Sequence, residues 1–399
     1  MFTPSQQLLD KYASILVNFA LNNGNGIKKD DVVYIRSQLP GLPLTKAIYR
    51  TTLKSGGHPL VEIQDDDFRL LKLEEGSDEQ IGFFAKEYYR AVVDTIDHLI
   101  GIFSDEDPLY LAKADPRKLF LSNSSMKPFR DWIYAKEDAK KLTWTLCLYG
   151  TEGVAREAGM SVEQFWDQIK RACFLDDIDP LEQWRRVNSD IKQLITILNE
   201  MPIKTLRLVA KDTDLKIHIG EHRKWVGGSG HNIPSFEIFT SPDWRGTEGR
   251  VFFDLPLYRY GNLIKDISLE FHNGQIVRAT AKQNESFLHE MISQKNADRI
   301  GEFSLTDRRF SKINRFMANS LYDENFGGDF GNTHLAIGKS IHDTCSLDLK
   351  NMDDEKYAAL GFNDSSEHTD IIATSNRTVT ATLVDGSTKL IYQDGEFRI

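Results

Sequence analysis

The chain has 399 residues and a formal charge of −10 at neutral pH, and hydrophobic residues make up 40% of it. This composition can build a large buried core, which excludes intrinsic disorder for most of the chain. The acidic balance argues against DNA or an anionic membrane as the main partner. The length predicts two or three domains.

Three cysteines, Cys147, Cys173 and Cys345, lie far apart in the sequence, and none belongs to a CxxC pair. This sparse, odd set excludes a disulfide scaffold and is typical of a reducing compartment. The first residues show no basic segment followed by an apolar one, so we expect no signal peptide. No apolar run approaches roughly 18 residues, so we expect no transmembrane helix. These features predict a cytoplasmic protein.

Helix-like and strand-like patterns alternate in the first half of the chain. Apolar residues at helical spacing predict helices near 8–19, 44–53 and 126–134 and a long helix from about Asp78. Short apolar runs predict strands at 32–35, 60–63, 99–103 and 142–148. This alternation predicts a parallel sheet covered by helices. The segment 160–200, in which Pro180 can start a helix, is predicted to be a helical connection.

Strand-like segments dominate after about residue 200, at 206–210, 215–219, 237–240, 250–254, 266–271 and 276–281. Asp385-Gly386 and Asp394-Gly395 predict the turns of two closing hairpins. Helical patterns return at about 284–297 and 307–320. We therefore expect two domains: an N-terminal α/β domain with a parallel sheet over 1–200, and a mixed, largely antiparallel α+β domain over 201–399.

Five ionisable residues of the second half stand in unusual places. Glu237 and Glu302 lie within apolar stretches, where a buried carboxylate needs a partner or a cation. His368 and Asp370, at positions i and i+2, would project from one face of a strand, as two ligands of one metal site would. His334 lies in an apolar strand, where a histidine is more often a hydrogen-bonded core residue than a ligand. From these residues alone, a purely structural role without metal stays open.

The surroundings of these residues resemble the aminopeptidase T and aminopeptidase S family, cytoplasmic exopeptidases that use a pair of metal ions. Four stretches carry the resemblance, in the order found in the family: Asn232 to Pro242, Gly301-Glu302 with Leu305, Asp323-Glu324-Asn325 leading to His334-Leu335-Ala336-Ile337-Gly338, and His368-Thr369-Asp370. Similar texture in the N-terminal half extends the resemblance to the whole chain. It implies a metal-dependent aminopeptidase, a hydrolase that releases N-terminal residues from short peptides, and a homodimer.

The resemblance assigns metal binding to Glu237, Glu302, His334, His368 and Asp370, and it assigns catalysis to Glu302 as general base and acid. It implies two divalent ions, and the mixed oxygen and nitrogen donors favour Zn, Co or Mn. Such a pair lowers the pKa of bound water to around 7. Three carboxylates, two dications and a bridging hydroxide would form a neutral cluster. We expect short peptides as substrates and neither nucleic acid nor membrane as a partner.

Two positions depart from the family pattern. Ile341 stands seven residues after His334, where the family has a tyrosine that assists catalysis, and Phe236 stands where a glycine is common. Because isoleucine has no hydroxyl, either His342 or another group substitutes for it, or the activity is reduced or altered. Two alternatives therefore stay open: an impaired metal-binding homologue that acts as a binding module, and a metal hydrolase of another amide. Three basic residues are candidates for binding a substrate carboxylate: Arg308, Arg309 and Lys339.

Overall fold

The computed structural model describes residues 2–348 and 352–399. The chain forms two compact units. The first comprises Met1–Asn188, Gly228–Ser235 and Met317–Leu321, and the second comprises Ser189–Gly227, Phe236–Phe316 and Tyr322–Ile399. The predicted domain boundary at residue 200 stays a prediction. Within the described part of the chain, no helix is both long and apolar enough to cross a membrane.

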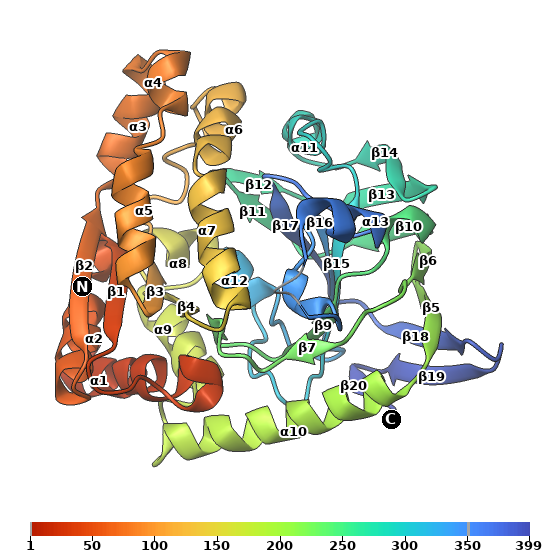
Figure 1. The fold of residues 1–399 in the computed structure, drawn as a ribbon, viewed down its shortest axis with the longest axis horizontal. Helices are drawn as coiled ribbons and strands as arrows, with labels where there is room; N and C mark the ends of the chain where they lie inside the picture. The colour runs from red at the N-terminus through yellow and green to blue at the C-terminus, as the bar shows by residue number, and fades with distance from the viewer. Residues whose placement is uncertain (1, 349–351) are drawn as a thin grey trace. The chain divides into compact units, whose positions relative to one another are not determined.

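A five-stranded parallel sheet, in the order β2-β1-β3-β4-β8, is the centre of the first unit (Figure 1). Its strands are β1 (Val32–Gln38), β2 (His58–Gln64), β3 (His98–Phe103), β4 (Thr143–Leu148) and β8 (Asn232–Ile233). On one face, Tyr34 packs against buried residues of two helices, among them Val93 and Phe129. Val33 and Ile35 point to the opposite face and are also fully buried. Burial on both faces explains why the inner strands β1 and β3 are apolar runs, whereas the edge strand β2 is largely exposed.

The helices of this half confirm most of the predicted pattern. They are α1 (Gln6–Ile15), α2 (Leu42–Lys54), α3 (Asp66–Glu75), α4 (Asp78–Gly82), α5 (Lys86–Thr95), α6 (Pro116–Ser125), α7 (Lys127–Asp138), α8 (Glu152–Glu157) and α9 (Val162–Ala172). Helix α10 (Pro180–Glu200) begins at the predicted proline. The single long helix from Asp78 is wrong, because α4 ends at Gly82, a poor helix former, and Phe83 is extended.

The second unit contains two large antiparallel sheets and a separate two-stranded hairpin. The larger has the order β14-β13-β10-β6-β5-β18-β19-β20. Its strands are β5 (Ile203–Ala210), β6 (Thr213–His218), β10 (Glu248–Phe253), β13 (Ile267–His272), β14 (Gln275–Thr280), β18 (Arg377–Leu383), β19 (Thr388–Gln393) and β20 (Glu396–Phe397). The two predicted turns lie between β18 and β19 and between β19 and β20. The expected largely antiparallel α+β architecture is thus confirmed.

The smaller sheet has the order β17-β16-β15-β9-β7 and carries the candidate site. Its strands are β7 (Val226–Gly227), β9 (Glu237–Thr240), β15 (Ile300–Thr306), β16 (Asn332–Gly338) and β17 (His368–Ala373). Every residue of β9, β15 and β16 is buried. Strands β11 (Leu257–Arg259) and β12 (Asn262–Ile264) form a separate antiparallel hairpin.

The helix predicted at 307–320 is wrong. The segment is irregular until α12 (Ser320–Asp323), and Ala318 has a positive φ of 50°. The buried carboxylate of Asp307 accepts hydrogen bonds from the backbone N–H groups of Arg309 and Phe397. Such side-chain bonds to the backbone compete with helical ones. The other predicted helix, 284–297, is present but shorter, as α11 (Glu285–Ile292).

Candidate metal centre

The smaller sheet of the second unit brings all five predicted ligands to one of its faces. Strand β9 carries Glu237, β15 carries Glu302, β16 carries His334, and β17 carries His368 and Asp370. The register places Thr306 opposite Glu237 and Ser304 opposite His334. Paired residues, and residues two apart on one strand, point to the same face, so Glu302 shares the face of both. Ala336, two residues after His334, lies opposite Asp370, which adds β17 to the same face.

A bulge in β15 directs Glu302 toward its neighbours. The register of β15 against β16 shifts between Ile300 and Glu302. A Cβ atom on Gly301 would lie 2.4 Å from the backbone oxygen of Lys339, so this position requires glycine. Bulges bend a strand and re-aim its side chains. The close backbone approach is therefore a physical reason for the Gly-Glu pair in the sequence.

Three donor groups converge around His334. Its Nε2 atom lies 3.1 Å from Oε1 of Glu302 and 3.3 Å from Oε2 of Glu237. His334 is fully buried, and both glutamates are nearly so. One ligand atom from each of the three residues lies within 4.8 Å of the others. This spacing suits donors around a single cation.

A second group of donors lies around His368. Its Nε2 atom is 3.4 Å from Oδ1 of Asp370 and 3.8 Å from Oε2 of Glu302. Glu302 thus offers one carboxylate oxygen to each histidine. The Nδ1 atom of His368 lies 2.7 Å from the backbone oxygen of Lys339, to which it donates, so that Nε2 faces the acids.

Glu324 lies near the same cluster and was not among the ligands predicted from the sequence. It follows α12 and is buried. Burial raises the pKa of Glu324 well above its ordinary value, and the nearby carboxylates of Glu237 and Asp370 add to this effect. Its neighbour Asn325 accepts a hydrogen bond from the backbone N–H of Phe236, 2.6 Å away, which fixes the chain just before Glu237. The signal available was an acid beside an asparagine in one of the four family-like stretches.

The pKa shifts of the clustered residues reflect an excess of buried negative charge. Burial raises the pKa of Glu302 to about 6, against a hydrogen bond from His334 that lowers it. Burial alone would lower the pKa of His334, but its two glutamate partners raise it well above the ordinary value. Burial likewise opposes the charge on His368, but Asp370 outweighs it and raises the pKa of His368 to about 9. Protons therefore balance the buried carboxylates, and divalent cations could take the place of these protons. The mixed oxygen and nitrogen donors fit such ions.

The two departures from the family pattern lie at the end of β16 and before β9. The backbone N–H of Ile341 donates to the hydroxyl of Ser241 at 2.8 Å. The ring of His342 stacks on Tyr357 at 3.7 Å between ring centroids and meets the edge of Phe362. His342 is therefore held among aromatic side chains, while Ile341 brings no hydroxyl.

The three basic residues considered for a substrate carboxylate all have acidic neighbours. The distances between charged groups range from 2.6 to 3.3 Å. The pairs are Arg308 with Glu396, Arg309 with Asp307, and Lys339 with Asp364. Each side chain thus has a structural partner of its own.

Comparisons with known proteins identify the family of this chain. The family model of thermophilic metalloproteases (M29) matches residues 5–397. Aminopeptidase 2 of Geobacillus stearothermophilus is 26% identical over 419 residues, covering 98% of this chain and 97% of its own length. Aminopeptidase PepS of Streptococcus thermophilus is 25% identical over 415 residues, covering 98% of both.

A solved structure, wild-type AmpT from Thermus thermophilus, matches the fold with a TM-score of 0.84 at 20% identity. The match covers 99% of this chain and 100% of that one. It confirms the expected two-domain fold class, and the family model confirms the resemblance seen in the sequence. The chain belongs to the M29 family of thermophilic metalloproteases.

Proposed function

We propose that the cluster binds two divalent metal ions and that this centre removes N-terminal residues from short peptides. The chain is a metal-dependent aminopeptidase, as its family and its full-length relatives indicate. One observation carries the two-ion proposal. The two oxygens of Glu302 are directed at two different histidines, and each histidine has a further acid beside it.

The distances divide the donors into two overlapping sets. Glu237, Glu302 and His334 would hold one ion, and Glu302, His368 and Asp370 would hold the other. Glu324 adds a fourth carboxylate, so the acids match the charge of two dications. When bound, ions of the Zn, Co or Mn class lower the pKa of bound water to about 7 and polarise the scissile carbonyl.

The protein's own groups would handle the proton and the substrate amine. Glu302, which lies beside both histidines, would accept a proton and return it. Because the carboxylates balance the charge of two dications, the terminal amine of a peptide would bind there in its neutral form. The side chain of His368 is 29% exposed, whereas that of His334 is 1% exposed, so we place the approach of substrate on the His368 side.

Metal content and activity together test this proposal. The purified chain, stripped with a chelator and reloaded with Zn, Co or Mn, should bind two equivalents and cleave aminoacyl reporter substrates. Glu302→Gln should abolish cleavage, because it removes both the shared ligand and the proton carrier. Glu248→Gln, on an exposed part of β10, is the matched control. Two bound equivalents without cleavage of any aminoacyl substrate would refute the peptidase assignment of the centre.

Ile341 favours one second candidate, an impaired homologue that binds metal and peptides without efficient turnover. Isoleucine cannot donate the hydroxyl hydrogen bond that the family's tyrosine provides. Ile341→Tyr should then raise kcat strongly in the reloaded protein. High kcat in the wild type, with little gain in the variant, would remove this candidate. Activity measurements on a panel of non-peptide amides separate the impaired homologue from a hydrolase of another amide.

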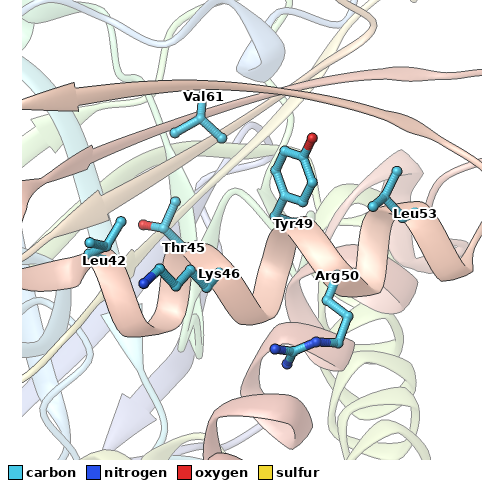
Figure 2. Close-up of a pocket in the computed structure, with 7 residues that line it drawn as sticks. All are labelled: Leu42, Thr45, Lys46, Tyr49, Arg50, Leu53 and Val61. Atoms are coloured by element: carbon cyan, nitrogen blue, oxygen red, sulfur yellow. The ribbon is translucent and has the colours of Figure 1, made fainter.

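An open apolar face of the first unit supports the proposal of a homodimer. Strand β2 is the edge of its sheet, and Leu60, Val61 and Ile63 are 44%, 42% and 38% exposed. Figure 2 shows the pocket beside it, where the side chains of Tyr49 and Leu53 project from α2 and that of Val61 from the neighbouring strand. The pocket has a volume of about 410 Å³ and is lined by Leu42, Thr45, Lys46, Tyr49, Arg50, Leu53 and Val61. Exposed apolar edge strands commonly add a further strand.

We propose that the occupant of this face is β2 of a second copy, paired antiparallel about a two-fold axis. Such pairing puts the start of one strand beside the end of the other. Lys29 and Lys54 flank the start, where Asp30 pairs with His58, and the acidic run Asp65–Asp67 follows the end. Unlike charges would therefore meet at both ends of the pair.

The oligomeric state tests this face directly. Val61→Lys should convert a dimer into a monomer in sedimentation measurements, because it places a charge at the centre of the pairing strand. Val277→Lys, at an exposed valine of β14, is the control and should stay dimeric. A wild-type monomer would refute the dimer, and a dimeric Val61→Lys would refute this surface.

We also propose that the protein acts in the cytoplasm. The three cysteines are all free and buried, and none forms a disulfide. Free thiols of this kind are typical of a reducing compartment. Fractionation of the source cells tests this assignment.

A further inference from the structure

A single arginine reaches from the β11–β12 hairpin to the strand that carries His368. Arg259 is the last residue of β11 and pairs with Asn262 across the turn. Tyr260 and Gly261 form this two-residue turn, with positive φ angles of 49° and 74°. Turns of this type suit tight hairpins, so the end of β11 is well defined. The guanidinium of Arg259 lies 4.5 Å from the centre of the Tyr260 ring, which restricts its direction.

The contacts of Arg259 fall on the residues at the start of β17. Its Nη2 atom lies 3.2 Å from a carboxylate oxygen of Glu367 and 3.3 Å from the backbone oxygen of His368. The side chain of Glu367 is completely buried, whereas that of Arg259 is 26% exposed. A buried carboxylate is stable only with a partner of opposite charge or hydrogen bonds. The guanidinium of Arg259 therefore contacts both the buried carboxylate of Glu367 and the backbone of His368, a candidate ligand.

We propose that Arg259 is a positioning residue for the metal centre, holding His368 in the orientation that directs Nε2 at the ions. The inference rests on the proposed function, because it requires His368 to be a ligand. Two contacts would then fix this histidine. Arg259 holds its backbone oxygen, and the backbone oxygen of Lys339 accepts from its ring Nδ1 at 2.7 Å.

The position of His368 in the sheet explains why such support is needed. His368 is the first residue of β17, opposite Gly338, the last residue of β16. The end of a strand has fewer ladder hydrogen bonds on either side than its middle, so side chains must help to hold it. His334, by contrast, lies in the middle of the fully buried β16. Arg259 supplies this help where the sheet ends.

Loss of such outer support typically weakens metal affinity about 10- to 100-fold. Arg259→Gln should therefore lower affinity for Co²⁺ by about this factor and change the visible absorption spectrum of the cobalt protein. Arg259→Lys retains a charged donor and should restore most of the affinity. Glu367→Gln leaves Arg259 in place and weakens only the ion pair, so we expect a smaller loss. Arg207→Gln, whose partner Asp214 is exposed on the larger sheet, is the matched control.

The readouts separate the possible outcomes. Unchanged cobalt affinity and spectrum in Arg259→Gln would overturn the inference while leaving the metal centre intact. If wild-type protein binds no cobalt, the proposed function itself fails. Thermal unfolding of chelator-treated protein checks for a general folding role. If Arg259→Gln unfolds at a lower temperature than wild type and Arg259→Lys does not restore the difference, Arg259 has such a role and the inference is also overturned. Should Arg259→Gln not fold, Glu367→Gln decides: the inference requires weaker binding and an altered spectrum in that variant.

Discussion

Two buried histidines, one in each unit, show how similar burial can serve different purposes. His98, on the parallel sheet, has a partner on each ring nitrogen: Thr143 at 2.8 Å and Asp31 at 2.9 Å. His334, on the antiparallel sheet, directs Nε2 at two glutamates, while no described residue bonds to its Nδ1. The first arrangement is complete within the protein. The second concentrates acids around one nitrogen, which is what a cation site requires.

The same contrast extends to the two five-stranded sheets. The parallel sheet buries apolar side chains on both faces, as Val33, Tyr34 and Ile35 of β1 illustrate. The inner strands of the antiparallel sheet are also buried, but this sheet has acids and histidines on one face. Buried polar groups cost free energy unless they are satisfied, so a sheet with this many of them indicates a binding function.

The largest effect should come from exchanging the two histidines for alanine. His334→Ala should lower metal content and reduce activity by at least about 10²-fold, with little change in the folding of the first unit. His98→Ala should leave metal content unchanged but cost about 1–3 kcal/mol of stability, because Asp31 and Thr143 lose a buried partner. Metal analysis and thermal unfolding measure both. Loss of metal in His98→Ala would contradict the comparison.

Removal of the ions should affect the two units unequally. At an ion concentration of 100 times its dissociation constant, binding stabilises the folded state by about 2.7 kcal/mol. Chelation should remove this from the second unit and leave amide exchange in β1 and β3 of the first unit unchanged. Hydrogen exchange with and without chelator gives the answer strand by strand. Equal loss of protection in both sheets would show that the ions stabilise the chain as a whole.

Glu324→Gln should have an intermediate effect and sharpen the definition of the cluster. The substitution keeps the shape of the side chain but removes one of four carboxylates, so we expect about 10- to 100-fold weaker ion affinity. Glu290→Gln, at a half-buried glutamate of α11 outside the cluster, is a suitable control. Calorimetric titration of the chelated protein with Zn²⁺ measures both. Wild-type affinity in Glu324→Gln would mean that Glu324 is a neighbour of the centre and not a contributor to it.

Local patterns predicted much of the first sheet, and the resemblance to a family of aminopeptidases assigned the five candidate ligands. Strands β1, β3 and β4 are short apolar runs because both faces are covered, and that pattern is visible without coordinates. The edge strand β2 is also an apolar run, although it is largely exposed. Strand β8 is different: Asn232 and Ile233 pair with Leu146 and Cys147, far away in the sequence, so no local pattern indicates their partner.

The missed features depend on contacts that form only in the folded chain. Glu324 follows a four-residue helix, and its burial among other acids comes from the meeting of β9, β16 and β17. The irregular segment after Asp307 follows from the hydrogen bond of that carboxylate to Phe397, near the other end of the chain. Helical spacing of apolar residues cannot reveal a competing bond of this kind.

The smallest predicted effect concerns pH and distinguishes the second histidine of the cluster. Burial would lower the pKa of His368, but Asp370 raises it to about 9; burial would raise the pKa of Asp370, but His368 lowers it to about 2. A raised histidine pKa stabilises the fold fully below about 6.5, and this contribution is lost as pH rises through 9. A lowered aspartate pKa stabilises it above about 3.9, and this contribution is lost as pH falls through 2.

Chelator-treated protein should therefore lose stability between about pH 6.5 and 9, and Asp370→Asn should flatten this decline because it removes the charge that raises the pKa of His368. Urea unfolding at a series of pH values measures how steeply the free energy of unfolding falls with pH in both proteins. The loaded wild type should show little of this decline, since an ion replaces the proton on His368. Equal slopes in chelated wild type and Asp370→Asn would mean that this carboxylate does not control His368, and the second donor set would then lose its main argument.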